Sequence, residues 1–256
     1  MLILISPAKS LDFETATTSQ VCSDAKFLKE SQTLIKQLRR LSVEEIAEFM
    51  SISPKLAQLN YERFLSWQKP FSMDNAKQAL LAFKGDVYTG LNAESLTEAE
   101  LQVAQKDLRI LSGLYGILKP LDLIQPYRLE MGKKLQTSKG NNLYEFWGDK
   151  ITSDINATLK EKGDQYLINL ASNEYFKSVN KKKIKAEIIT PVFKDLKNDQ
   201  YKVISFFAKK ARGLMTRFII QNQISDPEHL RAFNSDGYIF NPQLSKDKEL
   251  VFTREQ

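Results

Sequence analysis

MLILISPAKSLD, residues 1–12, sets four large aliphatic side chains before a serine, a proline and a polar loop. A short, continuous apolar run of this kind is typical of a β-strand that is buried on both faces. Pro7 ends the run, and Lys9 and Asp12 follow it. No basic segment precedes the apolar residues, so we expect the first strand of an α/β fold rather than a secretory signal.

Three later segments repeat this pattern, in which a strand runs straight into polar groups. They are LRIL before SGLYG (108–116), LINL before ASNEYFK (167–177) and VISFF before AKKARG (203–213). The carboxyl ends of parallel strands line the crevice where α/β proteins bind ligands. We therefore expect one cleft that brings together Ser6, Lys9, Tyr115, Asn173, Glu174, Lys209 and Arg212.

The rest of the chain is predicted to add helices, further strands and no linker. Apolar residues recur at helical spacing over 23–41, 42–50, 53–67, 75–83, 97–108 and 141–163, and most of these segments open at a Ser or Thr that can cap a helix. Residues 84–91 read as a turn, 185–207 as two strands and 236–254 as a closing hairpin. We predict an α/β (mixed α+β) fold, with a single compact domain over 1–256 and a mixed central sheet flanked by helices.

Composition narrows the classes of function. The chain is 42% hydrophobic and 27% charged, which is ordinary for a soluble globular protein. It has one cysteine, Cys22, and one histidine, His229, which argues against a disulfide framework, a histidine-rich metal site and a Ser/His or Cys/His catalytic pair. No phosphate-binding or dinucleotide-binding glycine motif occurs. We expect a cytoplasmic protein with no cofactor, no metal and no membrane span.

Positive charge is concentrated in one region. The net charge is +6, but residues 177–217 alone carry twelve Lys or Arg against three acidic residues, which leaves the remainder with a net charge of −3. Nucleic-acid affinity comes largely from neutralising phosphates. The regional excess indicates a polyanionic partner, although the run NKKKIK (180–185) by itself is also typical of a solvated turn.

The segment AKKARGLMTRFIIQNQI (208–224) is the clearest basic element. On a helix, its basic residues Lys209, Lys210, Arg212 and Arg217 fall on one half and its apolar residues on the other. The same pattern fits an ordinary amphipathic helix with solvated lysines. Gly213 favours a special role, because an interior glycine costs about 1 kcal/mol relative to alanine unless a close backbone approach requires it.

The stretch RILSGLYGILKPLDLIQPYRLEMG (109–132) has three glycines, two prolines and no regular period. Its glycine turn between apolar flanks fits a helix-hairpin-helix, in which backbone amides at the turn hold a DNA phosphate. It fits a loop at a strand end equally well. Tyr115 and Tyr127 would then stack on bases while Lys119 and Arg128 pair with phosphates. The alternative is a buried connector punctuated by Pro and Gly.

ASNEYFK (171–177) offers candidate reacting groups. Glu174 could act as an acid or base beside Asn173 and Lys177, or it could simply favour the N-terminus of a short helix that Ser172 or Asn173 caps.

Five segments taken together carry a resemblance to a known family. LILISPAKSLDF, KGDVYTGL, RILSGLYGILKPLDLIQPYRLEMG, LINLASNEYFKSV and VISFFAKKARGLMTRFIIQNQI, in this order, resemble the bacterial YaaA family of peroxide-stress-resistance proteins. The resemblance implies a cytoplasmic protein that helps cells survive hydrogen peroxide and is associated with lowering available intracellular iron. It also implies a DNA-binding protein of unusual mixed α/β fold, with a basic cleft, a helix-hairpin-helix and no assigned reaction.

Two hypotheses follow for the cleft. In the first, the chain binds DNA and protects it under peroxide stress, with these contact residues: Lys9, Tyr115, Lys119, Tyr127, Arg128, Lys177, Lys209, Lys210, Arg212 and Arg217. In the second, it is an enzyme that acts on a nucleotide or a damaged nucleobase, with Asn173 and Glu174 at the reacting centre. Direct iron sequestration is disfavoured, because one histidine and one cysteine leave only scattered carboxylates.

Overall fold

A mixed sheet with five parallel strands forms the centre of the computed structural model, which describes residues 1–17 and 19–255. The strand order is β11-β12-β9-β8-β1-β5-β6, with β10 paired to β9. The parallel strands are β1 (Leu2–Ile5), β5 (Leu108–Ser112), β8 (Tyr166–Leu170), β9 (Glu187–Lys197) and β12 (Glu249–Arg254). The antiparallel strands are β6 (Gly116–Leu118), β10 (Gln200–Lys202) and β11 (Ile239–Phe240). The mixed α/β fold predicted from the sequence is confirmed.

Strand β1 occupies the position that matters for ligand binding. It lies between β5 and β8, and it is paired in parallel with both. The chain therefore passes from β1 to one side of the sheet to form β5, and returns to the other side of β1 to form β8. A crevice opens at the carboxyl ends of two such strands because their following loops leave in opposite directions.

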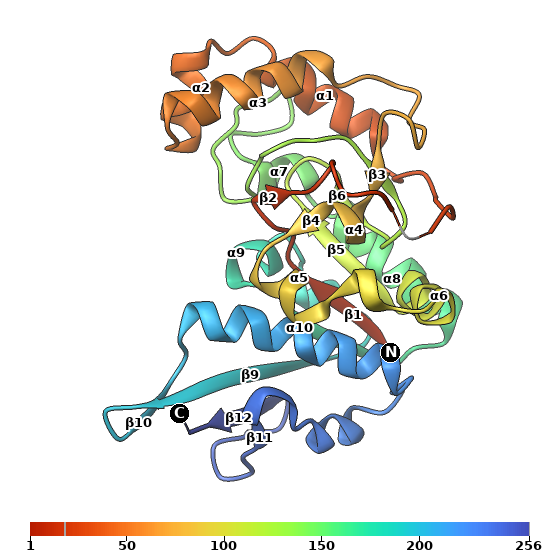
Figure 1. The fold of residues 1–256 in the computed structure, drawn as a ribbon, viewed down its shortest axis with the longest axis vertical. Coiled ribbons are helices and arrows are strands. Elements are labelled where there is room, and N and C mark those ends of the chain that lie inside the picture. Colours follow the sequence, from red (N-terminus) through yellow and green to blue (C-terminus); the bar gives the residue numbers. More distant parts are fainter. Residues whose placement is uncertain (18, 256) are drawn as a thin grey trace.

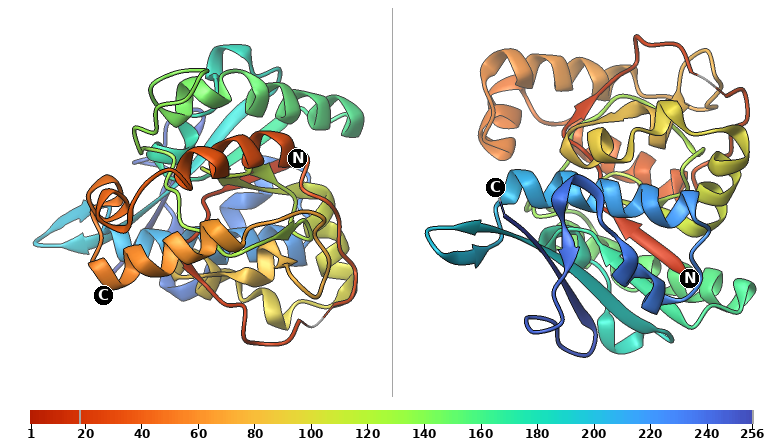
Figure 2. Two further views of the ribbon diagram at one scale, coloured as in Figure 1. Left: turned by 90° about the horizontal axis from the view of Figure 1, so that it is seen from above. Right: turned by 60° about the horizontal axis from the view of Figure 1, so that its bottom comes forward.

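The helices cover both faces of the sheet (Figures 1 and 2). Helices α7 (Leu143–Trp147) and α8 (Lys150–Lys162) lie on one side, while α5 (Asp86–Leu91), α6 (Glu98–Asp107) and α10 (Ser205–Gln221) lie on the other. A separate tier at the top of Figure 1 contains α1 (Leu28–Leu38), α2 (Val43–Met50) and α3 (Pro54–Ser66).

Shorter elements complete the chain. They are β2 (Ser10–Leu11) paired with β4 (Phe83–Lys84), β3 (Lys77–Gln78) paired with β7 (Leu123–Ile124), α4 (Ala79–Ala82), α9 (Asn173–Phe176), and the 3₁₀ turns η1 (Ala93–Ser95), η2 (Lys181–Lys183), η3 (Pro227–Ala232) and η4 (Ser235–Gly237). None of the helices within residues 1–17 and 19–255 combines the length and the apolar character that crossing a bilayer requires.

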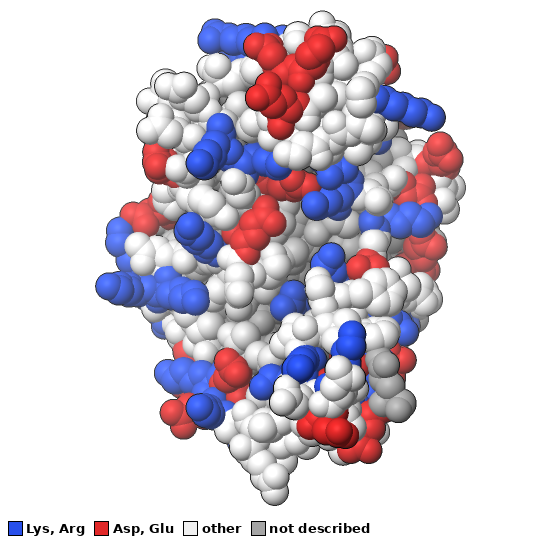
Figure 3. Space-filling view, turned by 90° about the vertical axis from the view of Figure 1, so that its left-hand side faces the viewer, with Lys and Arg blue, Asp and Glu red and all other residues white. Residues whose placement is uncertain are grey.

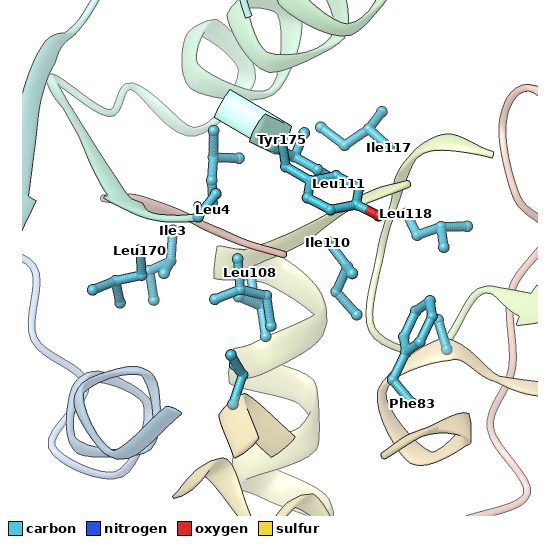
Figure 4. Packing of buried hydrophobic residues seen from close by; sticks show 14 of the residues in the cluster. Ile3, Leu4, Phe83, Leu108, Ile110, Leu111, Ile117, Leu118, Leu170 and Tyr175 are labelled. Atoms are coloured by element: carbon cyan, nitrogen blue, oxygen red, sulfur yellow. The ribbon is translucent and has the colours of Figure 1, made fainter. Parts of the chain in front are cut away.

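One continuous hydrophobic core joins these layers. All four side chains of β1 are fully buried, as their unbroken apolar run predicted. Figure 4 shows Ile3 and Leu4 among side chains of β5, β6 and β8, with Tyr175 of α9 and Phe83 of β4 closing the cluster. The strand ends are held by this packing, so the loops that follow them start from fixed points.

Several sequence predictions fail locally. VISFF is no strand: β10 ends at Lys202 and α10 begins at Ser205, so only three of the four predicted strands are parallel neighbours. Residues 86–91, read as a turn, form α5, and 75–83 hold two short strands around α4. The helix expected over 141–163 is broken at Gly148, whose positive φ of 48° ends α7. Gly163 ends α8 as predicted.

The stretch 109–132 is a β-hairpin followed by a connector, not a helix-hairpin-helix. Strands β5 and β6 pair antiparallel, with Ser112 opposite Gly116. Gly116 has a φ of 71°, and a Cβ on it would lie 2.7 Å from the Trp147 ring. The glycines therefore serve a tight turn and close packing. The helix-hairpin-helix expected here is wrong, since this glycine turn joins two strands.

Candidate functional site

A cavity of about 590 Å³ opens where β1 and β8 end, at the switch point of the sheet. Its wall comes from four parts of the chain: residues 6–10 after β1, 84–88 around the start of α5, 172–175 after β8, and α10. Six side chains expected to converge here do so: Ser6, Lys9, Asn173, Glu174, Lys209 and Arg212. Parallel strand ends thus gather these loops, as the sequence pattern predicted.

Hydrogen bonds among Ser6, Ser172 and Tyr88 hold the floor of the cavity in place. The Ser172 amide donates to Ser6 Oγ at 2.9 Å, and the two hydroxyls are 3.2 Å apart. The Tyr88 hydroxyl donates to the Ser6 carbonyl at 3.1 Å. Burial raises the pKa of Tyr88 well above its ordinary value, so this phenol stays protonated and remains a donor. The ends of β1 and β8 are therefore locked to α5.

Helix α10 reaches the cavity because two glycines let it cross α5 at backbone contact. A Cβ on Gly213 would lie 1.8 Å from the Val87 carbonyl oxygen, and one on Gly90 would lie 2.1 Å from the Lys210 carbonyl oxygen. The close backbone approach that Gly213 indicated in the sequence is thus present. It brings the first turns of α10 against the cavity mouth, with Lys209 and Arg212 one turn apart.

Three lysines stand around the cavity, each beside a carboxylate. Lys9 is 2.9 Å from Glu130, Lys84 is 2.9 Å from Asp12, and Lys209 is 4.0 Å from Asp86. Their side chains remain 64%, 67% and 52% exposed. Exposed ion pairs of this kind are weak, so the lysines keep donors available to an incoming anion.

Arg212 differs from these lysines. It is partly buried, and its guanidinium makes no hydrogen bond or ion pair with the residues that the structure describes. Burial lowers the pKa of this guanidinium below its ordinary value. Arg212 is the one cation of the cavity wall, within residues 1–17 and 19–255, that has no carboxylate oxygen within 4.0 Å.

The two candidate reacting residues lie in the cavity wall, and one of them also has a structural contact. Glu174 Oε1 accepts a hydrogen bond of 2.9 Å from the Gly132 amide, which ties α9 to the connector. The Tyr144 hydroxyl donates to the Glu174 carbonyl at 2.9 Å. Asn173 is exposed at the start of α9. Ser172 is the N-cap residue by backbone, but its hydroxyl points to Ser6 instead of capping α9.

The two tyrosines expected to stack on bases are buried. Tyr115 is 0% and Tyr127 4% exposed, and their rings pack edge to face at 5.2 Å. The Tyr115 hydroxyl accepts from Trp67 Nε1 at 3.1 Å and from the Gln125 amide at 3.0 Å. No base can reach either ring in this structure, so their assignment as stacking residues is corrected. The apolar segment GLYGIL around Tyr115 was a signal for the buried alternative, whereas Tyr127, between Pro126 and Arg128, carried no such signal.

The other predicted DNA contacts lie outside the cavity wall. Arg217 donates to the carbonyls of Leu91 and Asn92 at 2.9 Å and so caps α5. Lys210 pairs with Asp236 at 3.3 Å, and Lys177 lies 5.0 Å from the centre of the Tyr144 ring. Arg128 pairs with Glu130 at 3.2 Å, and Lys119 is exposed beyond the β5–β6 hairpin. Of these residues, Arg128 is a neighbour of the cavity lysine Lys9, because both pair with Glu130 Oε1.

Sequence reasoning missed the contribution of Lys84, Asp86 and Tyr88. These residues had been assigned to a turn, whereas Gly85, with a φ of 155°, lets the chain pass from β4 directly into α5 beside the cavity. The run Lys84-Gly85-Asp86, in which a glycine separates two charged residues, was the available signal for this contribution. On the face in Figure 3, a hollow crosses the middle, and basic side chains border it interspersed with acidic ones.

Comparison with known proteins gives the family. The model of the family described as peroxide stress protein YaaA matches residues 1–244. This chain belongs to the YaaA family. A UPF0246 protein of Aliivibrio fischeri strain MJ11 is 58% identical over all of this chain and 99% of its own length. A UPF0246 protein of Colwellia psychrerythraea is 57% identical over the full length of both. The resemblance seen in the sequence is confirmed, and membership of the YaaA family places the chain among peroxide stress proteins.

Residues 1–17 and 19–255 hold no group of three or more His, Cys, Asp or Glu side chains placed to share an ion.

Proposed function

We propose that this chain acts in the peroxide stress response as a cytoplasmic DNA-binding protein, with the cavity and its rim as the DNA-binding surface. The observation that carries the proposal is the convergence of Lys9, Lys84 and Lys209 from three distant parts of the chain around one cavity. All three ammonium groups are exposed enough to meet a phosphate backbone. Each neutralised phosphate releases counterions, which favours binding in a salt-dependent way.

The test is a salt titration of binding to a short DNA duplex. Each phosphate contact contributes about 0.9 to the slope of log affinity against log salt concentration. The variant Lys9→Gln/Lys84→Gln/Lys209→Gln should therefore lower the slope by about 2 to 3 and weaken binding at low salt. Circular dichroism would verify that the variant is folded.

A matched control removes the same charge elsewhere. Lys182, Lys183 and Lys185 line a separate, shallow surface hollow beside α8. Changing these three lysines to Gln should leave the slope within about 0.5 of the wild-type value. If the control variant loses the slope while the cavity variant keeps it, DNA binds at the lysine run and the proposed surface is wrong.

An enzyme acting on a nucleotide or damaged nucleobase is the second candidate, because Asn173 and Glu174 both line the cavity. Purified protein would be incubated with oligonucleotides that carry oxidised or deaminated bases. A product that disappears in Glu174→Gln would establish this activity, since the amide keeps the hydrogen bond to Gly132 but loses the proton-transfer group. No product with any substrate would leave binding as the function.

The proposal also has a cellular part, in which the protein lowers the amount of available intracellular iron. Cells with and without the protein would be compared for chelatable iron after a peroxide challenge. Equal iron in the two strains would remove this part while leaving the DNA-binding proposal untouched.

A further inference from the structure

The positive charge of Arg212 is balanced neither by a group in the described part of the protein nor by the proposed DNA contacts. A partly buried guanidinium costs free energy unless something compensates it, and proteins normally supply a carboxylate or several carbonyls. Arg217, five residues later on the same helix, has two carbonyl partners at 2.9 Å. Arg212 has neither within the described residues, yet it lines the cavity at the switch point of the sheet. The missing partner is expected to be an anion that enters the cavity.

The surroundings of Arg212 suit a phosphate group. Lys209 lies one turn earlier on the same face of α10, and its nearest carboxylate, Asp86, is at the 4.0 Å limit of an ion pair. Arg presents a planar fork of donors that matches phosphate oxygens in a bidentate way, while Lys adds a point charge. Asp86 and Glu174 also line the cavity, but both stay beyond ion-pair distance of Arg212, which leaves its donors unoccupied.

The rest of the cavity is much larger than a phosphate requires. Its wall includes the apolar faces of Pro7, Ala8, Val87, Tyr88 and Tyr175, most of them buried or nearly so. A volume near 590 Å³ lies within the range of sites that enclose a whole small ligand, about 300–1,000 Å³. Such walls favour a flat, largely apolar ring attached to the anion.

Polar groups of the cavity wall complete the pattern. Asn173 offers both an amide donor and an amide acceptor, and the carboxylate of Glu174 can accept hydrogen bonds from sugar hydroxyls. From this geometry we infer that the cavity binds one nucleoside monophosphate unit, with its phosphate on Arg212 and Lys209 and its base against the Val87, Tyr88 and Tyr175 wall. The unit is either a free nucleotide or a single nucleotide extruded from a DNA strand.

Calorimetric titration with AMP, GMP, CMP and UMP, with the matching nucleosides, and with inorganic phosphate tests the inference. At least one monophosphate should bind more than tenfold tighter than its nucleoside and than phosphate alone. Arg212→Gln should weaken that binding at least tenfold, and Arg212→Lys should weaken it less. Arg217→Gln, which removes the same charge from the backbone-bound position on α10, should leave it unchanged.

The free energy of unfolding provides a second test of the inference, and this test needs no ligand. Because Arg212 is uncompensated, Arg212→Gln should leave the urea midpoint of the ligand-free protein unchanged or raise it. A clear fall in that midpoint would show that Arg212 already has a structural partner and would overturn the inference. Binding of nucleosides as tightly as monophosphates, binding unaffected by Arg212→Gln, or inorganic phosphate binding as tightly as any nucleotide would do the same.

Two further experiments complete the test. One distinguishes a free nucleotide from a nucleotide extruded from a DNA strand, and the other separates this inference from the proposed function. If no free monophosphate binds at millimolar concentration, a single-stranded oligonucleotide whose affinity drops at least tenfold in Arg212→Gln supports the extruded nucleotide; no effect there overturns the inference. Lys9 and Lys84 belong to the proposed DNA surface but not to the inferred phosphate site, so the effect of Lys9→Gln/Lys84→Gln on the salt slope reports on the DNA surface alone.

Discussion

Gly213 of α10 lies against the backbone of Val87 in α5, with no room for a side chain between the two helices. A Cβ built on Gly213 would be 1.8 Å from the Val87 carbonyl oxygen. Real carbon and oxygen atoms do not approach this closely, and neither backbone can yield without moving its helix. The width of the cavity mouth therefore depends on the absence of a single methyl group.

Replacing Gly213 with Ala should destabilise the fold by about 3 kcal/mol or more, since overpacking of this kind forces a backbone shift. Urea unfolding would measure the loss. Gly163→Ala is the control: its φ of 69° is strained for Ala, but nothing lies within 4 Å of the added methyl group. It should cost about 1 kcal/mol. Equal costs for the two variants would contradict the steric argument.

Asp122 should make stability fall as the pH rises from about 4 to 6. Its carboxyl is 3% exposed, and burial raises its pKa from 3.8 to about 6 in spite of hydrogen bonds from Ser23 and the Lys119 amide. The folded state then binds more protons than the unfolded state in this window, so the contribution is present below pH 4 and lost above 6. The full effect is about 3 kcal/mol.

The comparison with Asp122→Asn isolates this group, because other carboxylates titrate in the same range. Subtracting the pH profile of the variant, measured by urea unfolding, from that of the wild type should leave a curve that falls with pH. A flat or rising difference would mean that Asp122 is ionised throughout.

Tyr115→Phe should lower stability without affecting DNA binding. The change removes the hydroxyl that accepts hydrogen bonds from Trp67 and Gln125, and two buried N–H groups lose their partner. Unpaired buried donors cost about 1–3 kcal/mol, which thermal unfolding would detect. Tyr201→Phe, at a partly exposed position on β10, should change stability by less than about 0.5 kcal/mol. Weaker DNA binding by folded Tyr115→Phe would show that this hydroxyl does reach DNA.

The sequence by itself determined the strands that carry the cavity. Short, mostly apolar runs identified β1, β5 and β8, because a strand buried on both faces has few polar positions. Only the run of β1 is unbroken, since Arg109 lies within β5 and Asn169 within β8. Residues that follow such strands must meet at one edge of a parallel sheet, which placed Lys9, Asn173 and Glu174 together. Gly213 signalled a close approach because glycine in a helix interior has no other local benefit.

Only the tertiary structure decided which basic side chains face the cavity and which tyrosine rings are accessible to a ligand. Arg212 and Arg217 look alike in the sequence, yet one faces the cavity and the other is bound to the carbonyls that end α5. Tyr115 has the flanking glycines of a binding loop but points into the core. Burial and ion pairing depend on residues that lie tens or hundreds of positions away in the sequence. The local spacing of residues does not reveal these partners, because they meet only when the chain folds.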